Sequence, residues 1–182
     1  MDGRAQRILL GVTGAIACYK VCSLVRLLTA SGREVQVVPT PNALKFVGEI
    51  TWRTLSQRPV ALDAFERGED WKPRHIALAE WCDAMMVAPC SANTLAKLAH
   101  GLADNLLTET ALACRRPLWV APAMNEAMWE HAATQANVET LRARGVRVLL
   151  PEAGALACGT SGAGRLPEPE ALFAALTGES PA

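Results

Sequence analysis

A run of residues able to bind a polar ligand directly follows a segment with the composition of a buried strand. Leu118–Ala121 is apolar with one aromatic and one branched residue, and Pro122 ends it. The next residues are Ala123-Met124-Asn125-Glu126-Ala127-Met128-Trp129. In an open parallel sheet, ligands bind just beyond the carboxyl ends of the strands. We therefore predict that the Asn125 carboxamide binds a polar group of a ligand, in an apolar surround that includes Met128.

Two other residues have side chains suited to proton transfer. His75 precedes Ile76-Ala77-Leu78-Ala79-Glu80-Trp81, and histidine exchanges protons near neutral pH. By itself, a lone histidine is more often structural or exposed than catalytic. Cys158 lies in a glycine-rich segment, where an accessible thiol could donate its proton. His100 and His131 have no such context and are assigned to the surface or the core.

Three segments at strand ends could contact a phosphate-bearing ligand. Gly11–Ala17 contains two glycines that permit a tight turn, and the start of the helix that follows favours an anion. A purely structural turn between strand and helix would explain the two glycines equally well. Ser91-Ala92-Asn93-Thr94 offers hydrogen-bonding side chains at a helix start, where the same residue types also serve as caps. Thr40-Pro41-Asn42 ends another strand, and Asn42 could equally be a helix cap.

Strand and helix patterns alternate along the chain and predict how these residues are positioned. The predicted strands are 8–12, 35–38, 59–62, 84–88, 118–121 and 146–150. The predicted helices are 15–30, 43–47, 51–56, 94–99, 105–114, 134–144 and 168–176, with loops at 65–74 and 151–167. This order predicts one α/β domain over residues 1–182, a three-layer αβα sandwich around a doubly wound parallel sheet.

Bulk properties narrow the possible partners. The formal net charge is zero, so the sequence predicts no positive electrostatic field that would attract a nucleic acid. No apolar run is long enough to cross a membrane, and the N-terminus lacks a signal-peptide core, so we expect a cytoplasmic protein. The six cysteines form no C-x-x-C pair, so no metal site is expected. A hydrophobic share of 51% indicates surface buried between subunits, or a single large core.

Together, these segments resemble the flavin-containing cysteine decarboxylases of the flavoprotein family, which include phosphopantothenoylcysteine decarboxylases and lantibiotic peptidyl-cysteine decarboxylases. The resemblance extends from about Arg7 to Leu172. The segments that carry it most clearly are His75–Trp81, Ser91–Thr108, Pro122–Trp129 and Ala157–Pro169. It implies a flavodoxin-like fold, FMN as cofactor, and a homo-oligomer that is a trimer or dodecamer.

The resemblance also implies roles for individual residues. Residues that would contact the cofactor are Gly14, Ala15, Ile16, Thr40, Asn42, Ser91, Ala92, Asn93, Thr94 and Ala123. His75 would act as the base while the flavin oxidises the substrate thiol, and Asn125, with Met128 beside it, would hold the carboxylate that is lost. Cys158 would protonate the enethiol product, and Arg165 would support its loop or meet a substrate anion.

The loop of Cys158 favours one substrate over the others. Decarboxylation of phosphopantothenoylcysteine to 4'-phosphopantetheine, in coenzyme A biosynthesis, needs a final reduction and a proton donor. Peptidyl-cysteine decarboxylases stop at the enethiol. The alternatives are therefore a peptide C-terminal cysteine as substrate, or a non-catalytic flavin-binding regulatory subunit. Glu80 departs from the family pattern, which often has Lys or Arg just before this Trp.

Overall fold

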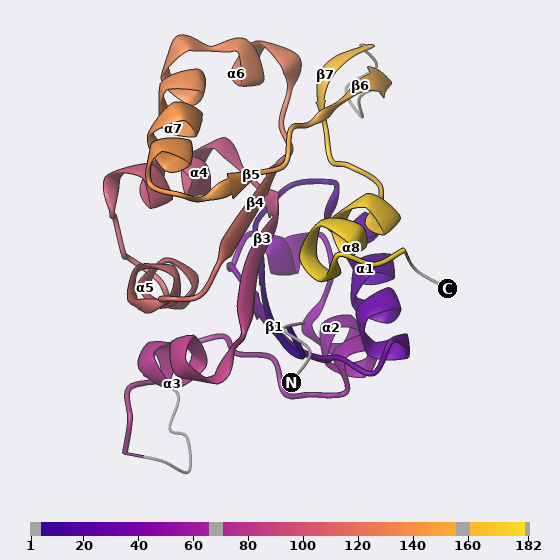
Figure 1. The fold of residues 1–182 in the computed structure, drawn as a ribbon, viewed down its shortest axis with the longest axis vertical. Coiled ribbons are helices and arrows are strands. Elements are labelled where there is room, and N and C mark those ends of the chain that lie inside the picture. Colours follow the sequence, from indigo (N-terminus) through magenta and orange to yellow (C-terminus); the bar gives the residue numbers. More distant parts are fainter. Residues whose placement is uncertain (1–4, 66–70, 156–160, 181–182) are drawn as a thin grey trace.

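The protein is built around a five-stranded parallel sheet (Figure 1). The computed structural model describes residues 5–65, 71–155 and 161–180. The strands of the sheet are β1 (Arg7–Val12), β2 (Glu34–Pro39), β3 (Ala84–Cys90), β4 (Leu118–Pro122) and β5 (Arg147–Val148). They lie in the order β2-β1-β3-β4-β5, and each adjacent pair is parallel. This is the predicted doubly wound sheet.

Helices cover both faces of the sheet. The helices are α1 (Cys18–Ala30), the 3-10 turn η1 (Ala43–Lys45), α2 (Glu49–Ser56), α3 (Arg74–Trp81), α4 (Ala92–His100), α5 (Leu106–Ala113), α6 (Glu126–Glu130), α7 (Ala132–Ala143) and α8 (Pro169–Thr177). In Figure 1, α1, α2 and α8 lie on one side of the strands, and α3, α4, α5 and α7 lie on the other. The predicted three-layer αβα sandwich is confirmed.

The two hydrophobic cores follow from the alternation of side chains along each strand. Ile8 and Leu10 of β1 face the core shared with α1, α2 and α8. Leu9, between them, faces the core shared with α3, α4, α5 and α7. All three side chains are fully buried. Strands buried on both faces explain why the sequence shows continuous apolar runs rather than alternation.

Two predicted segments differ from the observed structure. Residues 59–62 form no strand: this segment runs beside β2 and makes a backbone hydrogen bond from Ala61 N–H to Val37 O, while the Gln36 side chain binds Pro59 O. The segment predicted as a loop over 151–167 contains an antiparallel pair, β6 (Glu152–Ala155) and β7 (Ser161–Arg165). Its small residues lack the apolar alternation that identifies a strand, and the pairing itself forms these strands.

The connection order creates a switch point in the sheet. The chain passes from β1 to β2 on one side, and then crosses to β3 and β4 on the other side of β1. The loops after β1 and β3 therefore diverge, which leaves a crevice at the carboxyl edge. Among the described residues, no helix has the length and apolar content needed to cross a bilayer.

Candidate active site

A cavity of about 910 Å³ occupies this carboxyl edge. Its walls come from the residues after β1, β3 and β4, from the starts of α1 and α8, and from β7. The predicted site residues that line it are Gly14, Ala15, Ile16, Ser91, Ala92, Ala123, Asn125, Met128 and Arg165. Segments that are far apart in the sequence thus meet at one crevice. Of the other predicted residues, Thr40, Asn42, Asn93, Thr94 and His75 are not part of its lining.

A buried threonine ties the ends of β1 and β3 together beneath the cavity. The Thr13 hydroxyl donates to Pro89 O at 2.7 Å and accepts from Ser91 N–H at 2.8 Å. The Thr13 N–H also donates to Pro89 O, at 3.2 Å. Thr13 is 1% exposed, so these bonds are shielded from water. Thr13 therefore fixes the relative positions of the Gly14 turn and the Ser91 turn.

The predicted turn at Gly14 needs a glycine because the Asn42 backbone comes so close. A Cβ atom on Gly14 would lie 2.6 Å from the Asn42 Cβ and 3.2 Å from its carbonyl carbon. Thr40 N–H donates to Val12 O at 2.8 Å, which brings the second segment beside the first. Asn42 occupies the N-cap position of η1, but its side chain makes no capping hydrogen bond there. Thr40 and Asn42 support the cavity wall from behind.

Three of the helices that begin at the cavity are α1, α4 and α8. The first N–H groups of a helix have no partner within it, and the helix dipole adds partial positive charge there. Three such ends at one crevice favour an anionic ligand. The sequence indicated the starts of α1 and α4. The contribution of α8, which is more than 140 residues from α1 in the chain, required the folded structure.

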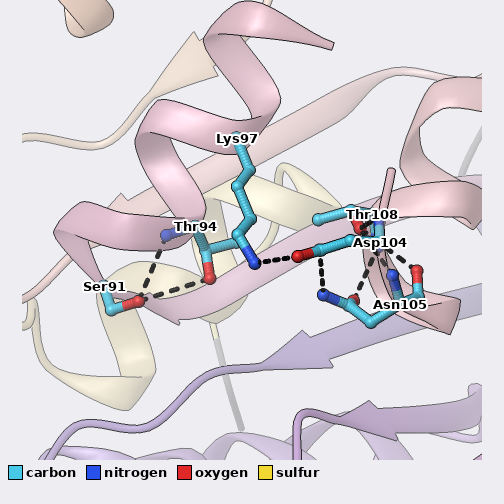
Figure 2. A network of polar contacts seen from close by, with 6 residues as sticks. All are labelled: Ser91, Thr94, Lys97, Asp104, Asn105 and Thr108. Atoms are coloured by element: carbon cyan, nitrogen blue, oxygen red, sulfur yellow. Dashed lines mark hydrogen bonds and ion pairs between the residues drawn. The ribbon is translucent and has the colours of Figure 1, made fainter. Parts of the chain in front are cut away.

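Ser91 combines two roles at the start of α4. Its hydroxyl accepts from Thr94 N–H at 3.3 Å and lies 3.3 Å from the Thr94 hydroxyl, as Figure 2 shows. The capping interpretation of Ser91 is therefore correct, and Ser91 also lines the cavity. Thr94 is buried, and Asn93 is exposed outside the cavity lining. In this chain, Ser91 and Ala92 are the members of the predicted phosphate segment that face the ligand space.

The rest of the family-like run Ser91–Thr108 is structural. Lys97 Nζ and Asp104 Oδ2 are 2.5 Å apart, and Asp104 accepts from the Asn105 amide at 2.9 Å (Figure 2). Asn105 and Thr108 form a capping box at the start of α5. These contacts set the turn between α4 and α5. They contribute no side chain to the cavity.

Asn125 projects its amide at the start of α6. Its Oδ1 accepts from Ala127 N–H at 2.9 Å, which fixes the orientation of the amide. The side chain is exposed at the cavity, and Met128, one turn further along α6, is 49% exposed beside it. The predicted pairing of a carboxamide with an apolar neighbour is thus present in the structure.

The β6–β7 hairpin lies against α6 and over the cavity. Gly164 O accepts from Met124 N–H at 3.0 Å. Gly164 has φ of 143°, and a Cβ there would collide with Met124 O, so the position requires glycine. Cys158, predicted to donate a proton, lies outside the described residues, in the segment that joins β6 to β7.

Arg165 belongs to a charged cluster on the cavity wall. Its guanidinium is paired with Glu168, which also binds Lys20 Nζ at 2.9 Å. The Lys20 ammonium, and then Arg165, hold the pKa of Glu168 below its ordinary value. Because Glu168 is the N-cap residue of α8, the cluster joins β7, α1 and α8. Lys20, Glu168 and Tyr19 also line the cavity, but no motif marked them in the sequence.

His75 lies on α3, outside the cavity of its own chain. Figure 1 shows α3 at the lower left, whereas α6 and the β6–β7 hairpin are at the top. His75 Nδ1 is 3.6 Å from Glu109 Oε2 on α5. This Oε2 is buried and accepts no hydrogen bond within the described parts of the chain. Nearby, Glu80 pairs with Lys72 at 2.7 Å, so its charge is neutralised locally.

The sheet order and the position of the cavity define a flavodoxin-like α/β protein with a ligand crevice at the switch point. The chain belongs to the Flavoprotein family, whose profile matches residues 2–180. No cluster of three or more His, Cys, Asp or Glu side chains suited to a metal ion is present among the described residues.

Three known proteins are similar to most of the chain. The coenzyme A biosynthesis bifunctional protein CoaBC of Haemophilus influenzae is 41% identical over 97% of this chain and 44% of its own length. A solved structure of a mutant PPC decarboxylase, complexed with pantothenoylaminoethenethiol, has a TM-score of 0.82 and 34% identity, covering 94% of this chain and 96% of that one. The structure of the FMN-dependent cysteine decarboxylase SpaF has a TM-score of 0.81 and 31% sequence identity, and the match covers 93% of this chain and 94% of SpaF. The chain thus spans less than half of the bifunctional relative.

Proposed function

We propose that this protein is an FMN-dependent decarboxylase that converts phosphopantothenoylcysteine to 4'-phosphopantetheine. One observation carries the proposal: nine of the predicted cofactor- and substrate-binding residues line one cavity, at the sheet edge where this fold binds ligands. The family membership and the similarity to CoaBC and to the PPC decarboxylase structure support the same activity.

The cavity wall has the features that a flavin phosphate requires. The starts of α1, α4 and α8 supply positive dipole ends, and the Gly14 turn permits a close approach of the backbone. Ala123 offers a small apolar surface at the end of β4. Bound there, FMN would supply the electron-accepting chemistry that makes a cysteine carboxylate able to leave. The protein itself would bind the cofactor and the substrate, orient the substrate, and transfer protons.

Asn125 is suited to hold the substrate carboxylate. Because its Oδ1 caps α6, its amide N–H₂ is the donor that meets a carboxylate oxygen. Met128 provides apolar contact beside it. Lys20 and Arg165 add positive charge to the wall, partly neutralised by Glu168. This arrangement suits an anionic substrate at the open end of the cavity.

His75 would serve the cavity of a neighbouring copy. Two of the surfaces with exposed apolar side chains are the surround of the cavity, with Ile16, Tyr19 and Met128, and the segment before α3, with Phe65 and Trp71. An interface between these two different surfaces is heterologous, and such contacts form a ring when the rotation between neighbouring subunits closes. The homo-oligomer that we expect, a trimer or a dodecamer, would bring α3 of one subunit to the cavity of the next.

Glu109 is placed to orient the His75 ring. An Nδ1–H directed at the buried Glu109 Oε2 leaves Nε2 as the nitrogen that accepts a proton. A base with a fixed tautomer and a fixed ring angle transfers protons more efficiently. We also propose that Cys158 donates the final proton, and that the enzyme is cytoplasmic.

Product analysis tests this function. The purified protein, with its flavin spectrum recorded, is incubated with phosphopantothenoylcysteine and, separately, with a peptide ending in cysteine. We expect carbon dioxide and the saturated 4'-phosphopantetheine from the first substrate. Turnover of the peptide alone would favour the alternative substrate, a peptide C-terminal cysteine. Bound FMN without turnover of either substrate would favour a regulatory subunit. Both results would contradict the proposal.

A further inference from the structure

Two cysteines meet at the ends of the helix pair α3 and α5, away from the active-site cavity. Cys82 follows α3 and Cys114 follows α5, and their Sγ atoms are 3.7 Å apart. Both are free thiols. Cys82 is fully buried, whereas Cys114 is half-buried and lines a second cavity of about 420 Å³. One thiol is therefore accessible, with the other directly behind it.

The second cavity shares no lining residue with the first and is strongly basic. Its four charged lining residues are Lys97, Arg115, Arg116 and Arg144. Asp104 neutralises Lys97, and Arg144 donates to Ala99 O at 2.5 Å. Arg115 and Arg116 are exposed and form no ion pair with a described residue. Such a surface attracts small anions to the Cys114 sulfur.

The two thiols differ in acidity because of their surroundings. The contact with the Cys82 sulfur, followed by the backbone N–H and the positive charge of Arg116, lowers the pKa of Cys114. The same contact with Cys114, together with burial, raises the pKa of Cys82. A thiolate is the reactive form of cysteine. Cys114, the accessible thiol beside Arg116, is therefore the nucleophile, and the buried Cys82 reacts only with a sulfur bound to Cys114.

We propose that Cys114 and Cys82 form a thiol–disulfide exchange site that reacts with small anionic disulfides. The Cys114 thiolate attacks one sulfur of the incoming disulfide, whose S–S bond breaks to release one thiolate. Cys82 then attacks the Cys114 sulfur, expels the second half as a thiolate, and gives its proton to the released product. The protein loses two thiol hydrogens, and the small disulfide is reduced to two thiols.

The local geometry accommodates the new bond. The two sulfurs must approach from 3.7 Å to about 2.0 Å. Both residues follow the last turn of a helix and have extended backbones, with ψ of 151° for Cys82 and 126° for Cys114. Rotation of the side chains can therefore supply much of the movement. The bond would link the ends of the two helices that carry His75 and Glu109.

Other described cysteines lack this combination of features. Cys18 is fully buried, and its thiol donates to Thr13 O. Cys90 is fully buried, and its burial raises its pKa. Cys22 is half-buried, and burial also raises its pKa, while no cationic cavity surrounds it. Cys22 is therefore the matched control for a partly accessible thiol without activation.

The test uses the intact protein and glutathione disulfide as the probe. Timed samples are quenched with an alkylating agent, and non-reducing peptide mapping assigns each bond to its cysteines. We expect a Cys82–Cys114 bond, formed at least about tenfold faster than modification of Cys22. Cys82→Ser should accumulate a glutathione adduct on Cys114, and Cys114→Ser should leave Cys82 unmodified. Cys22→Ser should cross-link as the parent protein does.

Two further measurements test the exchange site even if Cys82→Ser folds poorly. Replacing Arg115 and Arg116 together by Gln should slow the reaction about three- to tenfold at low salt, with a smaller difference at high salt. Oxidation of the parent protein should raise its Tm by several degrees, reversibly with dithiothreitol. A persistent adduct on Cys114 of the parent protein, faster modification of Cys22, or no Cys82–Cys114 bond in the folded protein would overturn the proposal.

Discussion

The crevice at the carboxyl edge and the α3–α5 helix pair differ in how much of the proposed chemistry one chain completes. The crevice is assembled within one chain: segments from Gly14, Ser91, Asn125 and Arg165 all face the same space. The helix pair holds His75 beside Glu109, but neither residue reaches that space. If the proposed function is correct, cofactor binding is a property of the subunit, whereas proton transfer by His75 is a property of the assembly.

The largest expected effect comes from removing the imidazole. His75→Asn should lower kcat about 10²–10⁴-fold, because it removes the imidazole that is the proposed base. Flavin affinity should stay at the parent value, since His75 is not in the cavity wall of its own chain. Steady-state kinetics and flavin titration check the two parts. Loss of flavin binding together with activity would contradict the separate roles of the crevice and the α3–α5 helix pair.

The integrity of the crevice should depend on Thr13. Thr13→Val removes the hydroxyl that joins Pro89 O to Ser91 N–H, and leaves that part-buried N–H without its acceptor. We expect a loss of about 1–3 kcal/mol in the free energy of unfolding, and weaker flavin binding. Urea denaturation and flavin titration measure these changes. Thr29→Val is the matched control, because the Thr29 hydroxyl bonds carbonyls within α1, far from the sheet ends. Equal effects of the two substitutions would contradict this role.

A smaller effect should follow from loosening the His75 ring. Glu109→Gln should reduce kcat about tenfold while KM and flavin affinity change little, because the amide can also donate and so permits the wrong tautomer. Glu109→Asp should recover part of the loss. Imidazole ¹⁵N chemical shifts report the tautomer directly, without turnover. An unchanged tautomer in Glu109→Gln would show that Glu109 does not orient the ring.

The smallest expected effect concerns the Lys20–Glu168–Arg165 cluster. The folded-state pKa of Glu168 is lowered, so its contribution to stability is complete above its ordinary pKa of 4.5 and is lost as the pH falls through the lowered value. Glu168 is 43% exposed, so this contribution is at most about 1 kcal/mol. Glu168→Gln should make the loss of stability below pH 4.5 less steep, measured by urea midpoints across pH. An unchanged pH dependence of stability would show that the Lys20–Glu168–Arg165 cluster does not stabilise the fold.

The sequence predicted most of the fold because its signals are local. Apolar runs ended by Pro89 and Pro122 identified buried strands, and the glycines Gly32 and Gly145 marked helix ends. The hairpin that contains Gly164 was missed because its small residues become strands only through pairing with each other and docking on Met124.

The candidate site was predictable in part for the same reason. Residues in strand-end turns, such as Gly14, Ser91 and Asn125, lie at the cavity as expected. Thr13, Lys20 and Glu168 take part through contacts with distant segments, which no spacing along the chain reveals. A motif around His75 indicates chemistry, but it carries no information about which copy of the chain the imidazole serves.

Mixed oligomers test the central claim most directly. His75→Asn and Asn125→Ala, carrying different tags, are co-expressed, and oligomers that contain both are isolated by two affinity steps. If His75 serves the cavity of the neighbouring subunit, each mixed trimer holds one intact pair, and roughly one third of the parent activity should return. Oligomers of either variant alone serve as controls and should be nearly inactive. Mixed oligomers no more active than these controls would contradict the account.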